Sequence, residues 1–245
     1  MNTLFVGQNL ISLELVNSTN TFLLELSNSE KLVEGTAVSA KHQSGGRGQR
    51  QNSWLSEPEK SLCVSVLFYP KIDLDHQFTF NKCIALALVS FFKGLGITSH
   101  IKWPNDIFVN DKKIAGILIE NAVRDKQLQK SIVGIGVNVN NDCSAIKEAI
   151  SIKETLEAEV SINELLSSLF VELEKYYLLF RNDKKQIQEL YNAHLYKKDS
   201  QLHFIKKGES FSAILKEVDD LGRLVLIEDG KESAYFMGEL SFNFL

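Results

Sequence analysis

The chain of 245 residues is poor in cysteine, proline and long apolar runs. Its three cysteines are an odd number without a CxxC spacing, which argues against a disulfide framework or a zinc site. Three prolines exclude collagen-like and proline-rich disordered chains. The longest apolar stretch, 83–92, falls far short of the about 20 residues that a membrane span needs. The N-terminus has neither a basic segment nor a cleavage signature, so we expect a cytoplasmic protein without membrane contact.

An excess of positive charge is also missing. The 27 Lys and Arg residues face 31 Asp and Glu residues, which gives a net charge of −4. Domains whose main partner is the nucleic-acid backbone usually carry a large basic excess, so this charge argues against such a role. The hydrophobic content of 44% and the charged content of 24% are ordinary for a soluble globular protein.

The hydrophobic pattern predicts an α+β fold. A polar triplet at 18–20 precedes apolar residues at helical spacing and predicts a helix start. Segments 36–41 and 61–68 predict strands, and 78–95 predicts a helix that stops at Gly94 or Gly96. Short β segments between 101 and 139 have connections too short for crossover helices, so these strands should be antiparallel. Residues 144–195 predict a run of helices, of which 163–180 is the clearest.

The pattern changes after Tyr196. A charged junction at 197–199 is followed by closely spaced short strands, which predicts a small barrel attached to a larger α+β domain. We therefore expect two domains, 1–196 and 197–245. The barrel strands are expected at 202–205, 211–218, 224–227 and 234–236.

The first candidate site is the segment 43–54, QSGGRGQRQNSW. Glycines such as Gly46 and Gly48 let backbone N–H groups approach a ligand, and Arg47 and Arg50 add cations. This combination suits a carboxylate or a phosphate. It is not a Walker loop, because no GKS or GKT follows. The alternative is a solvated hairpin with incidental arginines.

The second candidate is KWPND at 102–106, with Lys113 a turn later at the start of a strand. The carboxylate of Asp106 could hold Mg²⁺ or a ribose hydroxyl at this bend. Gly116 within the following strand indicates close approach of a ligand or a second backbone. The alternative is a turn held by its own Asn and Asp side chains, with surface lysines.

The third candidate is GIGVN at 134–138. Gly134 and Gly136 flank one isoleucine in a β-forming run, which an adenine ring or a bicyclic ligand packed flat against it would explain. A bulge or tight sheet–helix packing explains it equally well. The triplet Ser18-Thr19-Asn20 is a weak signal alone, because most such triplets only cap helices.

Taken in order, these segments resemble the biotin–protein ligases, also called biotin–[acetyl-CoA carboxylase] ligases. The family pattern is an STN helix start, Q-x-x-G-R-G-R with a downstream Trp, K-W-P-N-D, K-[LI]-A-G-[IV]-L-[IV]-E and G-x-G-x-N. The matching segments here are 18–20, 43–48 with Trp54, 102–106, 113–120 and 134–138. The resemblance implies a mixed, largely antiparallel sheet with helices, of the class II synthetase type. It also implies a small C-terminal SH3-like β-barrel.

The resemblance further implies an ATP-dependent ligase. Biotin and MgATP would give biotinyl-5′-adenylate, and a lysine of a biotin carboxyl carrier domain would then take up the biotinyl group. Arg47 and Lys113 would act at the reaction centre, and Asp106 would hold the metal. The biotin and adenylate contacts implied by the match are Ser18, Thr19, Asn20, Gln43, Gly46, Arg47, Gly48, Gln49, Lys113, Gly116, Gly134 and Asn138.

Two departures from the family pattern matter. The second loop arginine of the family is Gln49 here, with Arg50 beside it, so the phosphate grip would be looser or redistributed. Bifunctional relatives carry an N-terminal winged helix, but only 17 residues precede Ser18. We therefore expect a ligase without operator DNA binding, and the resemblance is compatible with a homodimer. Rival interpretations are a lipoate–protein ligase, a non-catalytic ligand-binding module of the same fold and an RNA-binding accessory.

Overall fold

The computed structural model describes residues 2–49 and 52–243. Its larger unit is an eight-stranded sheet in the order β1-β2-β3-β8-β7-β6-β5, with the short strand β4 pairing with one end of β8. Among the described strands of this sheet, β1 and β2 pair in parallel, and a helix connects them in the sequence. The remaining pairs are antiparallel. The strands are β1 Leu10–Val16, β2 Ala37–Gln43, β3 Ser61–Phe68, β4 Ile72–Asp73, β5 His100–Lys102, β6 Asp106–Val109, β7 Lys112–Arg124 and β8 Gln127–Asn138.

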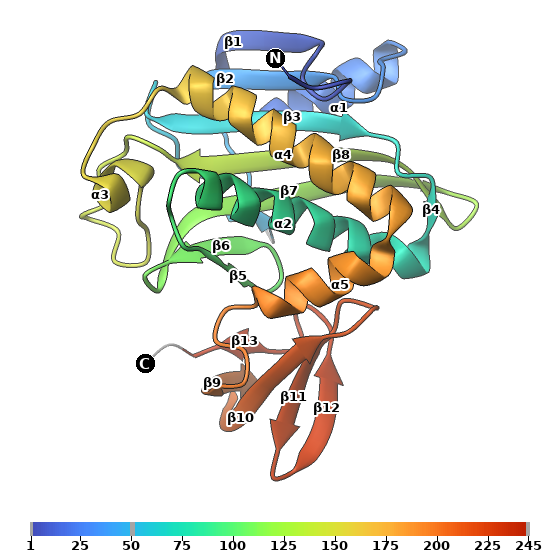
Figure 1. Cartoon of the computed structure of the whole chain (residues 1–245), viewed down its shortest axis with the longest axis vertical. Coiled ribbons are helices and arrows are strands. Elements are labelled where there is room, and N and C mark those ends of the chain that lie inside the picture. The colour runs from blue at the N-terminus through green and yellow to red at the C-terminus, as the bar shows by residue number, and fades with distance from the viewer. Residues whose placement is uncertain (1, 50–51, 244–245) are drawn as a thin grey trace.

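Helices cover both faces of this sheet. The helix α1, Thr19–Ser29, packs on one face through a small core that contains Leu23, Val38 and Leu67. The helices α2, Gln77–Gly94, and α4, Ile162–Asn182, cover the other face over the main core (Figure 1). All eight residues of β3 are buried because this strand lies between the two layers.

The remaining helical segments are short. A 3₁₀ turn, Leu74–His76, leads into α2. The helix α3 spans Ile152–Leu156, and α5 spans Lys184–Ala193. Within the described ranges, no helix combines the length and the apolar character that crossing a membrane requires.

A second sheet follows α5 and is called the C-terminal sheet here. Its strands are β9 Gln201–Lys206, β10 Glu209–Val218, β11 Leu224–Glu228, β12 Lys231–Tyr235 and β13 Ser241–Phe242, in the order β12-β11-β10-β9-β13. All neighbours are antiparallel. In the described part of the chain the outer strands β12 and β13 do not pair with each other, so the strands form an open sheet and no closed barrel is found.

The turn between β10 and β11 docks the C-terminal sheet onto the helices. The buried ammonium of Lys82 on α2 donates to the carbonyl of Asp219 at 2.7 Å and also contacts Gln188. The indole N–H of Trp103 donates to the carbonyl of Gly222 at 3.0 Å. Because Trp103 belongs to the KWPND segment, this contact joins the C-terminal sheet directly to a candidate site.

The fold agrees with the α+β class expected from the sequence, and α2 ends at Gly94 as expected. Two local expectations differ from the structure. The strand β1 was not predicted, and residues 144–151 are not helical. In this segment the N–H groups of Ile146 and Ala149 donate to the carbonyls three residues earlier, Cys143 and Ile146, so it forms successive turns. Helix α3 begins only at the capping box formed by Ser151 and Glu154.

Candidate functional site

A cavity of about 410 Å³ lies where the start of α1, the segment 43–54, the strands β7 and β8 and the C-terminal sheet meet. The segment 43–54 is called the glycine-rich loop below. Eleven of the residues singled out from the sequence line it. They are Ser18, Thr19, Asn20, Gln43, Arg47, Gly48, Gln49, Asp106, Lys113, Gly116 and Gly134. Five separate sequence motifs therefore converge on one cavity.

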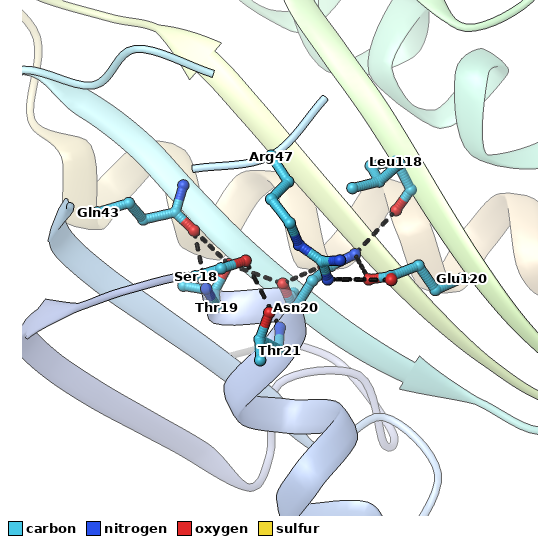
Figure 2. A network of polar contacts seen from close by, with 9 residues as sticks. Ser18, Thr19, Asn20, Thr21, Gln43, Arg47, Leu118 and Glu120 are labelled. Atoms are coloured by element: carbon cyan, nitrogen blue, oxygen red, sulfur yellow. Dashed lines mark hydrogen bonds and ion pairs between the residues drawn. The ribbon is translucent and has the colours of Figure 1, made fainter. Parts of the chain in front are cut away.

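The start of α1 forms a neutral polar wall of this cavity. The Ser18 side chain caps the helix by accepting the N–H of Thr21. The backbone N–H and the hydroxyl of Thr19 both lie within hydrogen-bond distance of Oε1 of Gln43, at 2.8 and 3.1 Å. Ser18, Thr19 and Asn20 are each only 3% exposed. Figure 2 shows these side chains grouped at the helix start, where they suit a ligand that both donates and accepts hydrogen bonds.

Three cations, Arg47, Lys102 and Lys113, line the same cavity. The guanidinium of Arg47 contacts Glu120 at 2.8 Å, and the ammonium of Lys113 contacts Asp106 at 2.7 Å. Burial lowers the pKa of Lys102, a change that the nearby carboxylate of Asp106 opposes. Such fixed positive groups can stabilise the negative charge that develops in an acyl- or phosphoryl-transfer reaction.

Side chains approach the strand glycines closely. A Cβ atom added at Gly136 would overlap the indole of Trp54, and one at Gly134 would overlap the side chain of Asn20. At Gly116 the nearest atoms would belong to Lys113 and Trp54, at 3.1–3.2 Å. The lack of a side chain at these glycines therefore leaves room for the side chains of Trp54, Asn20 and Lys113. The indole of Trp54 packs against Gly136, where the sequence pattern suggested that a flat ligand ring would pack.

A second cavity of about 510 Å³ lies behind the glycine-rich loop. Gly46 and Asn138, expected with the other site residues, line this second cavity and not the first, and the side-chain amide of Asn138 donates to the carbonyl of Ile150. Gln43, Ser53 and Trp54 line both cavities and form the wall between them. The indole N–H of Trp54 is buried and has no hydrogen-bond partner among residues 2–49 and 52–243.

The metal expectation rests on Asp106 alone. Within the described ranges there is no group of three His, Cys, Asp or Glu side chains that could hold a metal ion. One carboxylate is still compatible with Mg²⁺, which is often bound by one or two carboxylates together with the phosphates of a substrate. Arg50, expected as a second cation of the loop, lies outside the described residues.

Sequence reasoning missed two parts of the site. The segment 237–242 of the C-terminal sheet lines the main cavity through Met237, Leu240 and Phe242. Ser65 on β3 and Glu120 on β7 contact the cavity-lining residues Asn20 and Arg47. Glu120 is the last residue of the matched pattern KIAGILIE, so the motif itself was the signal that could have identified it.

Comparison with known proteins agrees with this geometry. Residues 12–138, more than half of the chain, match the model of the biotin/lipoate A/B protein ligase family. The chain belongs to this family. The match includes the start of α1, the glycine-rich loop, the KWPND segment and the glycines of β8, which line the main cavity together with the segment 237–242 outside the match.

Among similar family members are proteins named as biotin ligases. The bifunctional ligase/repressor BirA of Bacillus spizizenii is 36% identical over 141 residues, which cover 57% of this chain and 43% of that protein. The chain thus matches less than half the length of that relative. The biotin–[acetyl-CoA-carboxylase] ligase of Mycobacterium tuberculosis is 27% identical over 239 residues, 91% of this chain and 85% of that one.

The solved structures include a biotin protein ligase from Aquifex aeolicus in complex with biotin and ATP. It superposes with a TM-score of 0.80 at 24% identity and covers 96% of this chain and 99% of its own. This likeness extends over both sheets and establishes that they share a fold.

Proposed function

We propose that the chain is a biotin–protein ligase that activates biotin with ATP and transfers it to a lysine of a biotin carboxyl carrier domain. The observation that carries the proposal is the pairing of two chemistries in one cavity. A neutral polar wall, formed by buried Thr19 and half-buried Gln43, lies together with the cations Arg47 and Lys113. Biotin has matching halves, because its ureido ring donates and accepts hydrogen bonds and its side chain ends in a carboxylate.

In the proposed first step a carboxylate oxygen of biotin attacks the α-phosphorus of ATP. The P–O bond to the β-phosphate breaks, pyrophosphate leaves and biotinyl-5′-adenylate forms. Both reactants are anionic, so Arg47 and Lys113 would offset their repulsion and stabilise the charge of the transition state. Asp106 would bind the Mg²⁺ that accompanies the phosphates, and the metal would supply further positive charge there.

In the proposed second step the ε-amine of the carrier lysine attacks the acyl carbon of the mixed anhydride. An amide bond forms, the bond to the phosphate oxygen breaks, and AMP and a proton leave. The second cavity, which shares a wall with the first, has room for the nucleotide, and Gly46 and Asn138 line it. The net charge of −4 favours a protein substrate over a nucleic-acid partner.

Lipoate is the rival substrate, since the matched family includes lipoate ligases. The dithiolane ring of lipoate has no N–H or carbonyl group. It could therefore exchange no hydrogen bonds with the polar wall formed by Thr19 and Gln43, whereas the ureido ring of biotin can. The polar wall therefore favours biotin.

The test is an assay with the purified protein, MgATP and either biotin or lipoate. We expect pyrophosphate release with biotin, retention of biotinyl-adenylate, and labelling of one lysine when a carrier domain is added. If pyrophosphate is released with lipoate but not with biotin, the assignment of biotin as the substrate is wrong. Binding of biotin without pyrophosphate release would indicate a non-catalytic module.

A further inference from the structure

Glu120 connects the glycine-rich loop to the sheet. One nitrogen of Arg47, Nη2, donates to both carboxylate oxygens of Glu120, at 2.9 and 2.8 Å. The amide nitrogen of Asn20 donates to the same carboxylate at 2.8 Å and to the carbonyl of Leu118 at 3.3 Å. Figure 2 shows the guanidinium of Arg47, from the glycine-rich loop, and the amide of Asn20, from α1, both near the carboxylate of Glu120.

The contacts continue from Asn20 back to the start of the loop. The hydroxyl of Ser65 lies 2.5 Å from Oδ1 of Asn20 and 2.7 Å from the hydroxyl of Thr19. Thr19 in turn contacts Gln43, where the loop begins. A continuous chain of polar contacts therefore runs from Gln43 to Arg47 through α1, β3 and β7.

Glu120 and the loop that carries Arg47 differ in how many contacts hold them in place. Glu120 lies on β7, where it is paired with Ile132 of the central strand β8, and its partner Asn20 is only 3% exposed. The middle of the loop is bonded mainly to itself, through Gly48 N–H to Asn52 at 2.7 Å and Trp54 N–H to Gly46 at 2.9 Å. Glu120 thus supplies a fixed anchor for a segment that has few others among the described residues.

Two roles are open to a carboxylate in this place. It could compete with an anionic substrate for Arg47, or it could orient Arg47 toward that substrate. A guanidinium has five N–H donors, and Glu120 uses Nη2 alone. Within residues 2–49 and 52–243 no hydrogen bond is made by Nε or Nη1 of Arg47, so these donors can serve a ligand while Nη2 stays on Glu120.

We propose that Glu120 is a positioning residue: it tethers Arg47, and with it the glycine-rich loop, to β7 and so holds the arginine ready for the substrate anion. The proposal deepens the function proposed above and rests on it for the identity of that anion. Glu120 acts through Arg47 and Asn20 and takes no part in bond making.

Glu120→Gln tests the tether, because it removes the charge but keeps an oxygen that can accept from Asn20. Arg47→Met removes the other partner, and the double variant shows whether the two act together. Glu232→Gln is the matched control, since Glu232 forms a 2.6 Å ion pair with Lys216 on the C-terminal sheet.

The first measurement is amide hydrogen exchange of Gly48 and Trp54 in the substrate-free protein. We expect about fivefold faster exchange in Glu120→Gln, which corresponds to losing the free energy that a partly exposed ion pair contributes. Arg47→Met and the double variant should exchange at the same increased rate as Glu120→Gln. Glu232→Gln should leave both amides unchanged. Unchanged exchange in Glu120→Gln would overturn the tether.

The second measurement is the kinetics of adenylate formation. We expect Glu120→Gln to raise the KM for biotin about fivefold with kcat within about twofold, and to have no further effect in the Arg47→Met background. A lowered KM would show that Glu120 competes with the substrate, and an equal loss in the Arg47→Met background would show a role independent of the arginine. Either result overturns the proposal. If exchange responds as expected but the unaltered protein activates no biotin, the proposed function fails and the tether is supported.

Discussion

Lys82 gives a test of how the C-terminal sheet is held, because its burial makes stability depend on pH. The side chain is 0% exposed and donates to the carbonyl of Asp219. Burial lowers its pKa from 10.5 to about 8, and the nearby carboxylates of Asp220, Asp219 and Glu217 oppose this shift. A lysine with a lowered pKa in the folded state costs stability wherever it is charged in both states, which here means below pH 8.

This cost diminishes as pH rises between the two pKa values. The unfolded chain then binds more protons at this position than the folded one, so the free energy of unfolding increases with pH. With pKa values of about 8 and 10.5, the contribution of Lys82 grows by about 1 kcal/mol between roughly pH 7.5 and 9.

The assay is urea unfolding of the unaltered protein and of Lys82→Met at several values of pH. The difference between their free energies of unfolding removes the titration of groups that both proteins share. We expect it to move by about 1 kcal/mol in favour of the unaltered protein across this window. Lys93→Met, at an exposed lysine of the same helix, controls for the loss of one lysine. A difference for Lys82→Met that stays flat with pH would refute the reasoning.

Five further substitutions have defined outcomes. Arg47→Ala and Lys113→Ala should each raise the barrier to adenylate formation by about 2–4 kcal/mol, measured as single-turnover pyrophosphate release; a near-normal rate would exclude that residue from the mechanism. Gly136→Val should displace the neighbouring indole and weaken biotin binding at least about tenfold by calorimetry, and unchanged affinity would contradict the packing. Glu174→Leu should lower the free energy of unfolding by about 2–3 kcal/mol, because three backbone N–H groups at 4–6 lose their acceptor; a urea midpoint equal to that of the unaltered protein would contradict this. Gln49→Arg should slow the dissociation of preformed biotinyl-adenylate in a filter-binding assay, and a faster rate would count against a phosphate clamp at this position.

Local patterns were sufficient to predict much of the fold. Alternation identified β3, and helical spacing followed by glycine identified α2 and its end. The antiparallel order of β5 to β8 followed from the shortness of the turns alone. The strand β1 was missed because its pairing partner lies beyond α1, and nothing within LISLELV indicates a parallel neighbour.

The site was predictable in its residues but not in its contacts. Arg47 and Glu120 are 73 positions apart in the sequence. In the sheet, β3 and β8 lie between β2 and β7, so the two residues meet only because the loop that follows β2 reaches across these strands to β7. No spacing in the sequence encodes that order. The contribution of Met237 and Phe242 to the cavity depends likewise on how the C-terminal sheet docks, which the buried contacts of Lys82 and Trp103 determine.

The arrangement of charge explains how such a site can exist without its ligands. Several cations around one cavity repel one another, and removing them from water adds to the cost. Here Asp106 on β6 offsets Lys113, and Glu120 on β7 offsets Arg47. Both carboxylates lie on strands of the central sheet, so each cation keeps a fixed position as well as a compensated charge. A site built in this way needs little rearrangement when an anion arrives, and preorganised charge of this kind is what lowers the barrier to a reaction between anions.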